Sequence, residues 1–250
     1  MTPFPAPGMT GQVTELYRYP IKSVGGEALG EVQVTRRGLV GDRAWAVTNE
    51  DGKFGSGKST RRFRRMDGLL GFQAALPAGA AEPQLTLPDG SLQPATSETA
   101  TAALCQATGR TVRVTPEGPI SHFDEGPLHL LTTSALAWLA QAHGAPVASG
   151  HFRHNLLLDT GPAPEHLEER WLGRQLVIGD TLTIQIVAPM PRCVMVNMAQ
   201  PGVPADPHIL KTIATLHPDA CFGVLAQVVQ PGPLRLGDAA RLLSSPKELS

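Results

Sequence analysis

Leu176-Val177-Ile178-Gly179-Asp180 is echoed near the end of the chain by Leu234-Arg235-Leu236-Gly237-Asp238. In both copies a run of apolar or alternating residues leads into a Gly-Asp turn, and another β-favouring run follows. The echo is too short to be a repeat of the kind found in solenoid proteins. We interpret both copies as hairpins, and together they predict a β-barrel that they help to close.

Strand and turn signals of the same kind run through the rest of the chain. Residues 49–52 and 88–90 carry Asp-Gly hairpin signals between apolar runs. Helices are predicted at residues 97–108 and 133–143, and a third at 207–216 with Asp206 as its N-cap. Strands are predicted at residues 13–19, 31–35, 43–48, 111–115, 156–158, 222–229 and 239–243. The sequence therefore predicts a mainly β fold, a β-barrel with covering helices of α+β type.

The composition limits the domain count and the class of partner. A chain of 250 residues suits one large domain or two small ones. The 21 basic and 22 acidic side chains give a net charge of −1. No nucleic-acid partner is expected, because binding to the phosphate backbone needs a basic surface. The stretch 77–120 is rich in Pro and Ala and poor in reactive side chains, so we place the seam between two domains there.

The cysteines and the N-terminus bear on the cellular compartment. Cys105, Cys193 and Cys221 are an odd number and far apart, which argues against a disulfide framework or a zinc site built from Cys-x-x-Cys pairs. Residues 1–11 have no charged start and no apolar run, so they do not resemble a signal peptide. No segment has the length of a membrane-spanning helix. We expect a cytoplasmic protein without a membrane partner.

Residues 52–59 match the nucleotide-binding pattern G-x-x-x-x-G-K-[ST] in full, with Lys58 and Ser59 at its end. In such a loop the backbone amides bind phosphates and a helix follows the motif. Here Gly52 lies in a hairpin signal, and residues 60–66 show no helical apolar face. We favour a basic, Gly-rich loop, and we keep open that it binds an anionic ligand without hydrolysing it.

Cys193 is the cysteine best placed for chemistry. It follows Pro189, Pro191 and Arg192, so the prolines keep the segment extended and the arginine favours the thiolate. A thiolate can act as a nucleophile or as a ligand of a soft metal. Without further support, a single cysteine is more often a small buried side chain, and this is our interpretation of Cys105 and Cys221.

Polar residues at predicted strand ends form a second group. Arg153 and Asn155 precede the strand at 156–158 and point the same way on an extended segment. Lys22 and Ser23 follow the first strand, and Arg43 follows a Gly-Asp turn. Cations and amides in such positions suit an anionic, hydrogen-bonding ligand, although each alone could be a solvated surface group.

Five segments in fixed order carry a family resemblance. The chain resembles the MOSC family, an N-terminal β-barrel domain followed by the MOSC domain, which includes molybdenum cofactor sulfurase C-terminal regions and the mitochondrial amidoxime reducing component. The resemblance runs from about residue 11 to residue 243 and implies domains at 11–115 and 116–245. The segments that carry it are Tyr19-Pro20-Ile21-Lys22-Ser23, residues 38–43, Phe152-Arg153-His154-Asn155, Pro191-Arg192-Cys193 and residues 234–238.

The resemblance implies a cofactor and a site. It implies a molybdopterin-type molybdenum cofactor, with Cys193 as the metal ligand and catalytic residue. The aminotransferase-like part of the sulfurases has no counterpart here, so no pyridoxal phosphate site is expected. The residues that the resemblance implies for holding the pterin and its phosphate are Lys22, Ser23, Arg43, Thr132, Arg153, Asn155 and Arg192.

Three functional hypotheses follow. The first is an oxidoreductase that reduces N-hydroxylated or similar small molecules with electrons from a separate reductase. The second is a carrier that delivers the cofactor, or a persulfide on Cys193, to an accepting protein. The third is a nucleotide binder at residues 52–59. Leu225 stands where the reducing members of the family carry an aromatic residue, so the substrate stays open.

Overall fold

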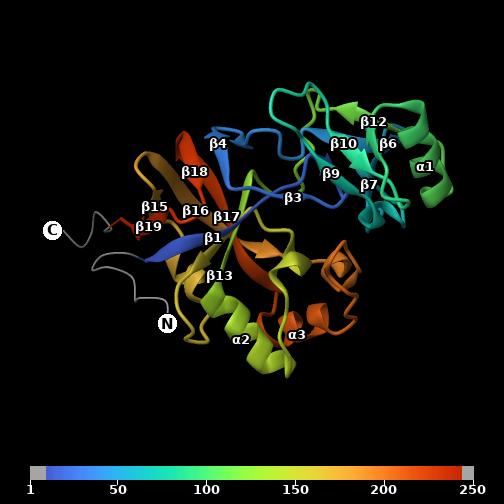
Figure 1. Ribbon diagram of the computed structural model, residues 1–250. Coiled ribbons are helices and arrows are strands. Elements are labelled where there is room, and N and C mark those ends of the chain that lie inside the picture. The colour runs from blue at the N-terminus through green and yellow to red at the C-terminus, as the bar shows by residue number, and fades with distance from the viewer. Residues whose placement is uncertain (1–9, 244–250) are drawn as a thin grey trace.

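The fold is mainly β, as the sequence predicts. In the computed structural model, which describes residues 10–243, most of the chain lies in short strands, with three α-helices among the described residues. Two bodies of β-structure lie side by side, one built largely from the N-terminal half of the chain and one from the C-terminal half (Figure 1). The prediction for the extreme N-terminus (1–9) and the last two residues of the predicted second domain lie outside the described residues.

A closed barrel of seven strands forms the larger body. Its strand order is β14-β13-β17-β16-β15-β19-β1, and β1 pairs back onto β14 to close the ring. Fully buried Leu16, Leu130, Leu156, Ile184 and Val224 belong to its core. The strands are β1 (Gly11–Arg18), β13 (Leu128–Thr132), β14 (Leu156–Asp159), β15 (Gln175–Ile178), β16 (Leu182–Pro191), β17 (Cys221–Gln230) and β19 (Ala239–Leu242).

The two Gly-Asp turns differ in what they connect. The first joins β15 to β16 in an antiparallel hairpin, as predicted. The second joins β18 (Gly232–Arg235) to β19, but β18 pairs with β4 (Glu31–Thr35) while β19 pairs with β15 and β1. The prediction of a second hairpin was wrong, because the turn is a corner between two sheets. The turns themselves meet, since the Gly179 amide donates to the Ala239 carbonyl at 3.0 Å.

Residues 21–116 contribute most of the smaller body. A three-stranded and a five-stranded sheet enclose a core that includes Ile21, Val47, Phe72, Leu85 and Leu104. The predicted boundary at 115/116 stays a prediction, and the topology adds that β1 runs in the larger barrel. The strands are β2 (Ile21–Lys22), β6 (Trp45–Asn49), β7 (Phe54–Ser56), β8 (Phe63–Arg65), β9 (Gln73–Ala75), β10 (Gln84–Thr86), β11 (Leu92–Pro94) and β12 (Val112–Pro116); β3 (Glu27–Ala28) pairs with β1 and β5 (Gly38–Leu39) with β4.

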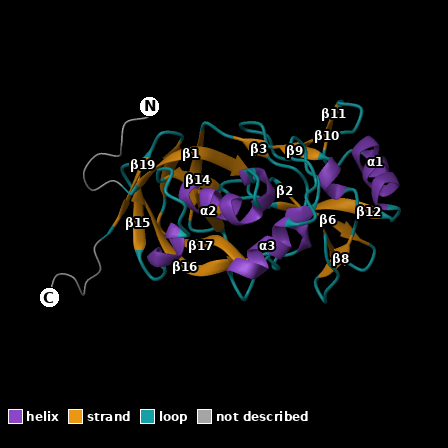
Figure 2. Ribbon diagram, turned by 90° about the horizontal axis from the view of Figure 1, so that it is seen from below, coloured by secondary structure: helices purple, strands orange, loops and turns teal. Residues whose placement is uncertain are grey.

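The helices cover the sheets. α1 (Glu98–Thr108) begins one residue after the predicted start, with Ser97 as its N-cap, and packs on the smaller body. α2 (Thr133–His143) and α3 (Ile209–Leu216) lie side by side on the barrel (Figure 2). The third helix begins two residues later than predicted, because Asp206 accepts from the His208 amide at 2.8 Å and closes a turn before it. Short 3₁₀ turns are η1 (Leu69–Gly71), η2 (Ser149–Phe152), η3 (Leu167–Trp171) and η4 (Val194–Asn197).

No helix within residues 10–243 combines the length and the apolar character needed to cross a membrane.

The nucleotide-like motif at 52–59 does not have the architecture of a phosphate-binding strand–loop–helix. Gly52 donates to the Asn49 carbonyl at 3.0 Å in the hairpin turn, and the motif then contains strand β7. After Ser59 the chain bends into strand β8 rather than into a helix. The helix N-terminus that would hold nucleotide phosphates is therefore missing from this motif.

Candidate functional site

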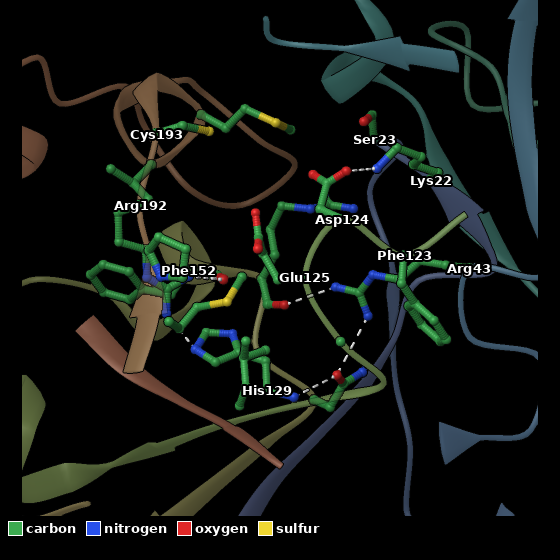
Figure 3. A pocket seen from close by; sticks show the side chains of 18 of the residues that line it. Lys22, Ser23, Arg43, Phe123, Asp124, Glu125, His129, Phe152, Arg192 and Cys193 are labelled. Atoms are coloured by element: carbon green, nitrogen blue, oxygen red, sulfur yellow. Dashed lines mark hydrogen bonds and ion pairs between the residues drawn. The ribbon is translucent and has the colours of Figure 1, made fainter. Parts of the chain in front are cut away.

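One pocket lies where the two bodies meet. The space inside it is about 910 Å³ when the open solvent at its mouth is included. Figure 3 shows Arg192 and Cys193 on one side, Lys22, Ser23 and Arg43 on the other, with Asp124 and Glu125 between them. Seven of the eight residues that the resemblance implies for the site line it: Lys22, Ser23, Arg43, Arg153, Asn155, Arg192 and Cys193.

Strand β16 delivers Cys193 to the pocket. Pro191, the last residue of the strand, is paired with Cys221 of β17, and the Arg192 amide donates to the Ala220 carbonyl at 3.0 Å. Cys193 then precedes η4 and is half-buried, whereas Cys221 is buried in the barrel. All three cysteines are free thiols. Cys193 is thus the cysteine that combines a fixed backbone with access to the pocket.

Arg192 holds this segment in place through its side chain. Its guanidinium donates to the carbonyls of Phe222 at 2.7 Å and Phe152 at 3.1 Å, and to Nε2 of His129. Burial lowers the pKa of Arg192 to about 9, opposed by the nearby thiols of Cys193 and Cys221. Because its donors are occupied by protein acceptors, Arg192 supports the pocket wall rather than offering free donors to a ligand.

Two arginines clasp the ring of Tyr19. The Arg153 guanidinium lies 4.3 Å and that of Arg43 4.7 Å from the ring centroid. Arg153 donates to the Val24 carbonyl at 2.8 Å and to Gln200 at 3.2 Å, and Arg43 donates to the Arg153 carbonyl at 3.1 Å. Desolvation lowers the pKa of Arg153 to about 10 and raises that of Tyr19 to about 12. The result is a rigid cationic wall that joins the two bodies.

The Asn155 amide connects this wall to the barrel. Its oxygen accepts from the His129 backbone amide at 3.1 Å and lies 3.5 Å from Arg43, and its nitrogen donates to the Tyr17 carbonyl at 3.2 Å. Asn155 is buried. Its polar atoms are engaged by the protein, so it orients Arg43 and the strands around it.

Backbone strain is concentrated at the pocket. Among the described residues, four that are not glycine have positive φ, and three of them line the pocket: Ser23 at 61°, Arg43 at 47° and Arg153 at 52°. Such conformations carry an energetic cost outside glycine and cluster at functional sites. The strain marks the same three positions that the sequence selected by residue type.

Lys22 is a buried lysine paired with a carboxylate. It is 5% exposed and forms an ion pair with Asp124, and its ammonium group lies 4.6 Å from the centroid of the Phe63 ring. Burial lowers the pKa of Lys22 to about 8, opposed by Asp124. The neighbouring Ser23 lines the same pocket. Lys22 and Ser23 together can therefore bind an oxyanion.

His129 adds a buried polar atom to the pocket. Its Nε2 accepts from Arg192, so the proton resides on Nδ1, which is enclosed by protein beside the backbone of Arg153. Burial, and then the charge of Arg192, hold the pKa of His129 well below its usual value. Because Nδ1 is enclosed by protein, His129 supports the Arg192 side chain from inside the pocket wall and offers no donor to a ligand.

Sequence reasoning missed part of the lining. Asp124 and Glu125 contribute carboxylates, and Met190 and Met195 contribute thioethers beside Cys193. A signal for the acidic pair existed, because it lies before Gly126-Pro127 at the start of a buried strand, as Arg153 and Asn155 do before β14. The position of the methionines could not be found from any local pattern.

Thr132 was assigned to the cofactor site from the resemblance, and the structure places it elsewhere. Its hydroxyl caps α2 by accepting from the Ala135 amide at 3.1 Å and donates to Glu168 at 2.6 Å. Thr132 is fully buried and does not line the pocket. Capping a helix, a common use of threonine before a helical pattern, explains this residue.

Comparisons with solved structures gave remote likenesses. YuaD from Bacillus subtilis is 14% identical over 95% of this chain and 97% of its own, with a TM-score of 0.48. YiiM from Escherichia coli is 14% identical over 94% of this chain and 70% of its own, with a TM-score of 0.42, and YiiM from Geobacillus stearothermophilus is 19% identical over 47% and 54%, with a TM-score of 0.36. Comparison with curated protein sequences gave no match.

Family models match nearly the whole described chain. The model of the MOSC N-terminal beta barrel domain matches residues 10–115, which contain Lys22, Ser23 and Arg43. The model of the MOSC domain matches residues 102–241, which contain Arg153, Asn155, Arg192 and Cys193. The pocket is therefore lined from both matched regions, and the chain belongs to the MOSC domain family.

Proposed function

We propose that this protein binds a molybdenum cofactor of the molybdopterin type, with the Cys193 thiolate as a ligand of the metal. The observation that carries the proposal is the meeting of a half-buried thiol and six polar or cationic side chains from distant segments in one pocket. The MOSC family is associated with binding of this cofactor.

The residues present fit such a group. A phosphorylated pterin needs cations for its phosphate, hydrogen-bond partners for its ring and a soft ligand for its metal. Lys22 and Ser23 would bind the phosphate. Arg43 and Arg153, fixed on Tyr19, would provide positive potential along the wall. The strained backbone at three of these positions fits a preorganised site.

We further propose that the protein is an oxidoreductase for N-hydroxylated or similar small molecules. The bound group would supply two-electron redox chemistry, so that an N–OH compound, two electrons and two protons give the N–H compound and water. A separate reductase would supply the electrons. The chain's own residues would bind the substrate at the pocket mouth and move protons. Lys22, whose pKa is about 8, and the Asp124 carboxylate are placed for proton transfer near neutral pH.

The test of cofactor binding is metal and pterin analysis of protein purified from a host that makes the cofactor. Wild type should contain close to one molybdenum per chain, and Cys193→Ala should lose the metal. Cys105→Ala is the matched control, because Cys105 packs on the smaller core away from the pocket, and it should retain the metal. Cys193→Ala protein with the full molybdenum content would refute the assignment of the thiolate.

A second assay separates catalysis from delivery. The loaded protein is supplied with a chemical electron donor and an N-hydroxylated compound, and formation of the reduced product is measured. Turnover that is lost in Cys193→Ala supports the oxidoreductase. A loaded protein that reduces no such compound, but passes cofactor or sulfur to an acceptor protein, would instead be a carrier.

A further inference from the structure

Lys58 is the cation of the pocket that the function proposed above leaves without a role. It lies in the β7–β8 loop (residues 57–62), within the nucleotide-like motif, and lines the pocket. The other pocket arginines and lysine are engaged by carboxylates, carbonyls or side-chain oxygens. The Lys58 ammonium group has no hydrogen bond or ion pair within residues 10–243. It makes a cation–π contact with Phe63, 5.6 Å from the ring centroid.

The loop that carries Lys58 is held firmly. The Arg65 amide donates to the Ser59 hydroxyl at 3.0 Å, and the Phe63 amide donates to the Thr60 hydroxyl at 3.1 Å. Gly57 packs against the segment after Cys193, since a Cβ at this position would lie 2.6 Å from Cγ of Met195. The loop is thus fixed against both bodies, and Lys58 is presented to the pocket with little loop entropy left to lose on binding.

Lys22 and Lys58 approach the same aromatic ring. Their ammonium groups lie 4.6 Å and 5.6 Å from the centroid of Phe63. Arg62 also contacts this ring, at 5.1 Å, but only the two lysines line the pocket. They are therefore suited to neighbouring anionic groups of one ligand. A lysine binds phosphate as a mobile point charge, so two lysines can each take one of two linked phosphates.

We propose that Lys22 and Lys58 together form a diphosphate site, in which Lys22 binds one phosphate group and Lys58 the next. The Gly-Lys-Ser sequence serves this site through the lysine side chain alone, because no helix N-terminus follows it. Applied to the cofactor, and resting on the function proposed above, the site selects a form whose pterin phosphate is linked to a second phosphate.

The test uses the full chain purified without cofactor, and inorganic orthophosphate and pyrophosphate as titrants in calorimetry. Wild type should bind pyrophosphate about tenfold more tightly than orthophosphate, the size of effect that one added charge-assisted hydrogen bond gives. Lys58→Met should abolish this preference and leave the orthophosphate affinity within about twofold of wild type, while Lys22→Met should weaken both. Lys58→Arg keeps the charge and should keep the preference.

Arg61→Met is the matched control. Arg61 is an exposed cation in the same loop that does not line the pocket. Its removal therefore tests whether the overall positive charge of the loop, rather than Lys58 itself, attracts the anion. Equal loss in Arg61→Met and Lys58→Met, or equal affinity of wild type for the two titrants, would overturn the proposal. Thermal denaturation checks that each variant is folded.

The two proposals fail separately. Protein that takes up no pterin but prefers pyrophosphate through Lys58 would retain the diphosphate site and lose the cofactor assignment. Protein that takes up molybdenum and pterin, and shows no effect of Lys58→Met on pyrophosphate binding, would lose the diphosphate site alone.

Discussion

The two walls of the pocket differ in how their polar atoms are used. On the barrel wall (Arg153, Asn155 and Arg192), the side-chain donors are largely occupied by backbone carbonyls and neighbouring side chains. On the N-terminal wall (Lys22, Ser23 and Lys58), one ion pair with Asp124 is the single hydrogen-bonded contact of the three side chains within residues 10–243. The side chains of the barrel wall therefore stabilise the fold, whereas those of the N-terminal wall have donors that can bind a ligand. Substitutions should therefore affect stability on the first wall and binding on the second.

The largest effect is expected at Arg192. Arg192→Met removes the donors to the carbonyls of Phe222 and Phe152 and leaves these groups without a partner inside the barrel. Hydrogen bonds from a charged donor are worth about 1.5–3 kcal/mol, so we expect a loss of about 3 kcal/mol in the free energy of unfolding. Urea denaturation measures it, with Arg61→Met as a control that should change stability by less than about 0.5 kcal/mol. A loss below about 1 kcal/mol would show that the barrel wall does not depend on Arg192.

Glu168 gives the barrel side a pH dependence of stability. Its carboxyl is fully buried, and burial raises its pKa from 4.5 to about 7, opposed by the hydrogen bond from Thr132. A folded-state pKa above the unfolded value contributes stability that is present at low pH and is lost as the pH rises through about 7. This rise of about 2.5 pKa units, at about 1.4 kcal/mol per unit, makes the loss at pH 8 about 3–4 kcal/mol.

Glu168→Gln should remove this dependence. The amide oxygen can still accept from Thr132, and no charge has to be buried. The variant should be close to wild type in stability near pH 5 and more stable by about 3 kcal/mol near pH 8. Melting temperatures measured between these pH values check it, with exposed Glu50→Gln as the control. Parallel pH profiles of wild type and Glu168→Gln would contradict the burial of a titrating carboxyl.

How much of the site the sequence could predict depends on the kind of signal. Lys22, Arg43 and Arg153 follow or precede strands beside Pro or Gly-Asp signals, so residue type and local position selected them, and all three line the pocket. Thr132 precedes a helix, where a cap and a ligand look identical in sequence. Its hydroxyl donates to Glu168, so Thr132 serves as a helix cap away from the pocket. This hydrogen bond joins residues far apart in the chain, so no local pattern could reveal it.

The fold shows the same division. The hairpins at residues 49–52 and 88–90 and the spans of α1 and α2 were predicted, because each is decided by residues close together in the chain. The second Gly-Asp turn was predicted as a turn, but the partners of β18 and β19 were not, because they depend on β4, β15 and β1. Lys58 is the corresponding case in the site. Its motif was found at once, yet its place in the pocket depends on Phe63 and Met195.

The smallest effect is expected at Asp124, on the N-terminal wall. Asp124→Asn removes the carboxylate that pairs with Lys22. Phosphate then binds the ammonium group without first breaking an ion pair. At pH 6 we expect about threefold tighter binding of orthophosphate, the size of effect of a partly exposed ion pair. Asp124 also raises the pKa of Lys22, which burial lowers to about 8, and its removal lets the lysine lose its proton at a lower pH.

The gain should therefore shrink and disappear as the pH approaches 8.5, because the charge that binds phosphate is lost sooner in Asp124→Asn than in wild type. Glu125→Gln removes a carboxylate from the same pocket without touching Lys22, so its smaller gain should vary less with pH. Calorimetric titration with orthophosphate at pH 6 and pH 8.5 separates the two variants. If Asp124→Asn binds phosphate more weakly at pH 6, Asp124 orients Lys22 for its ligand, and the side chains of the N-terminal wall also hold one another in place.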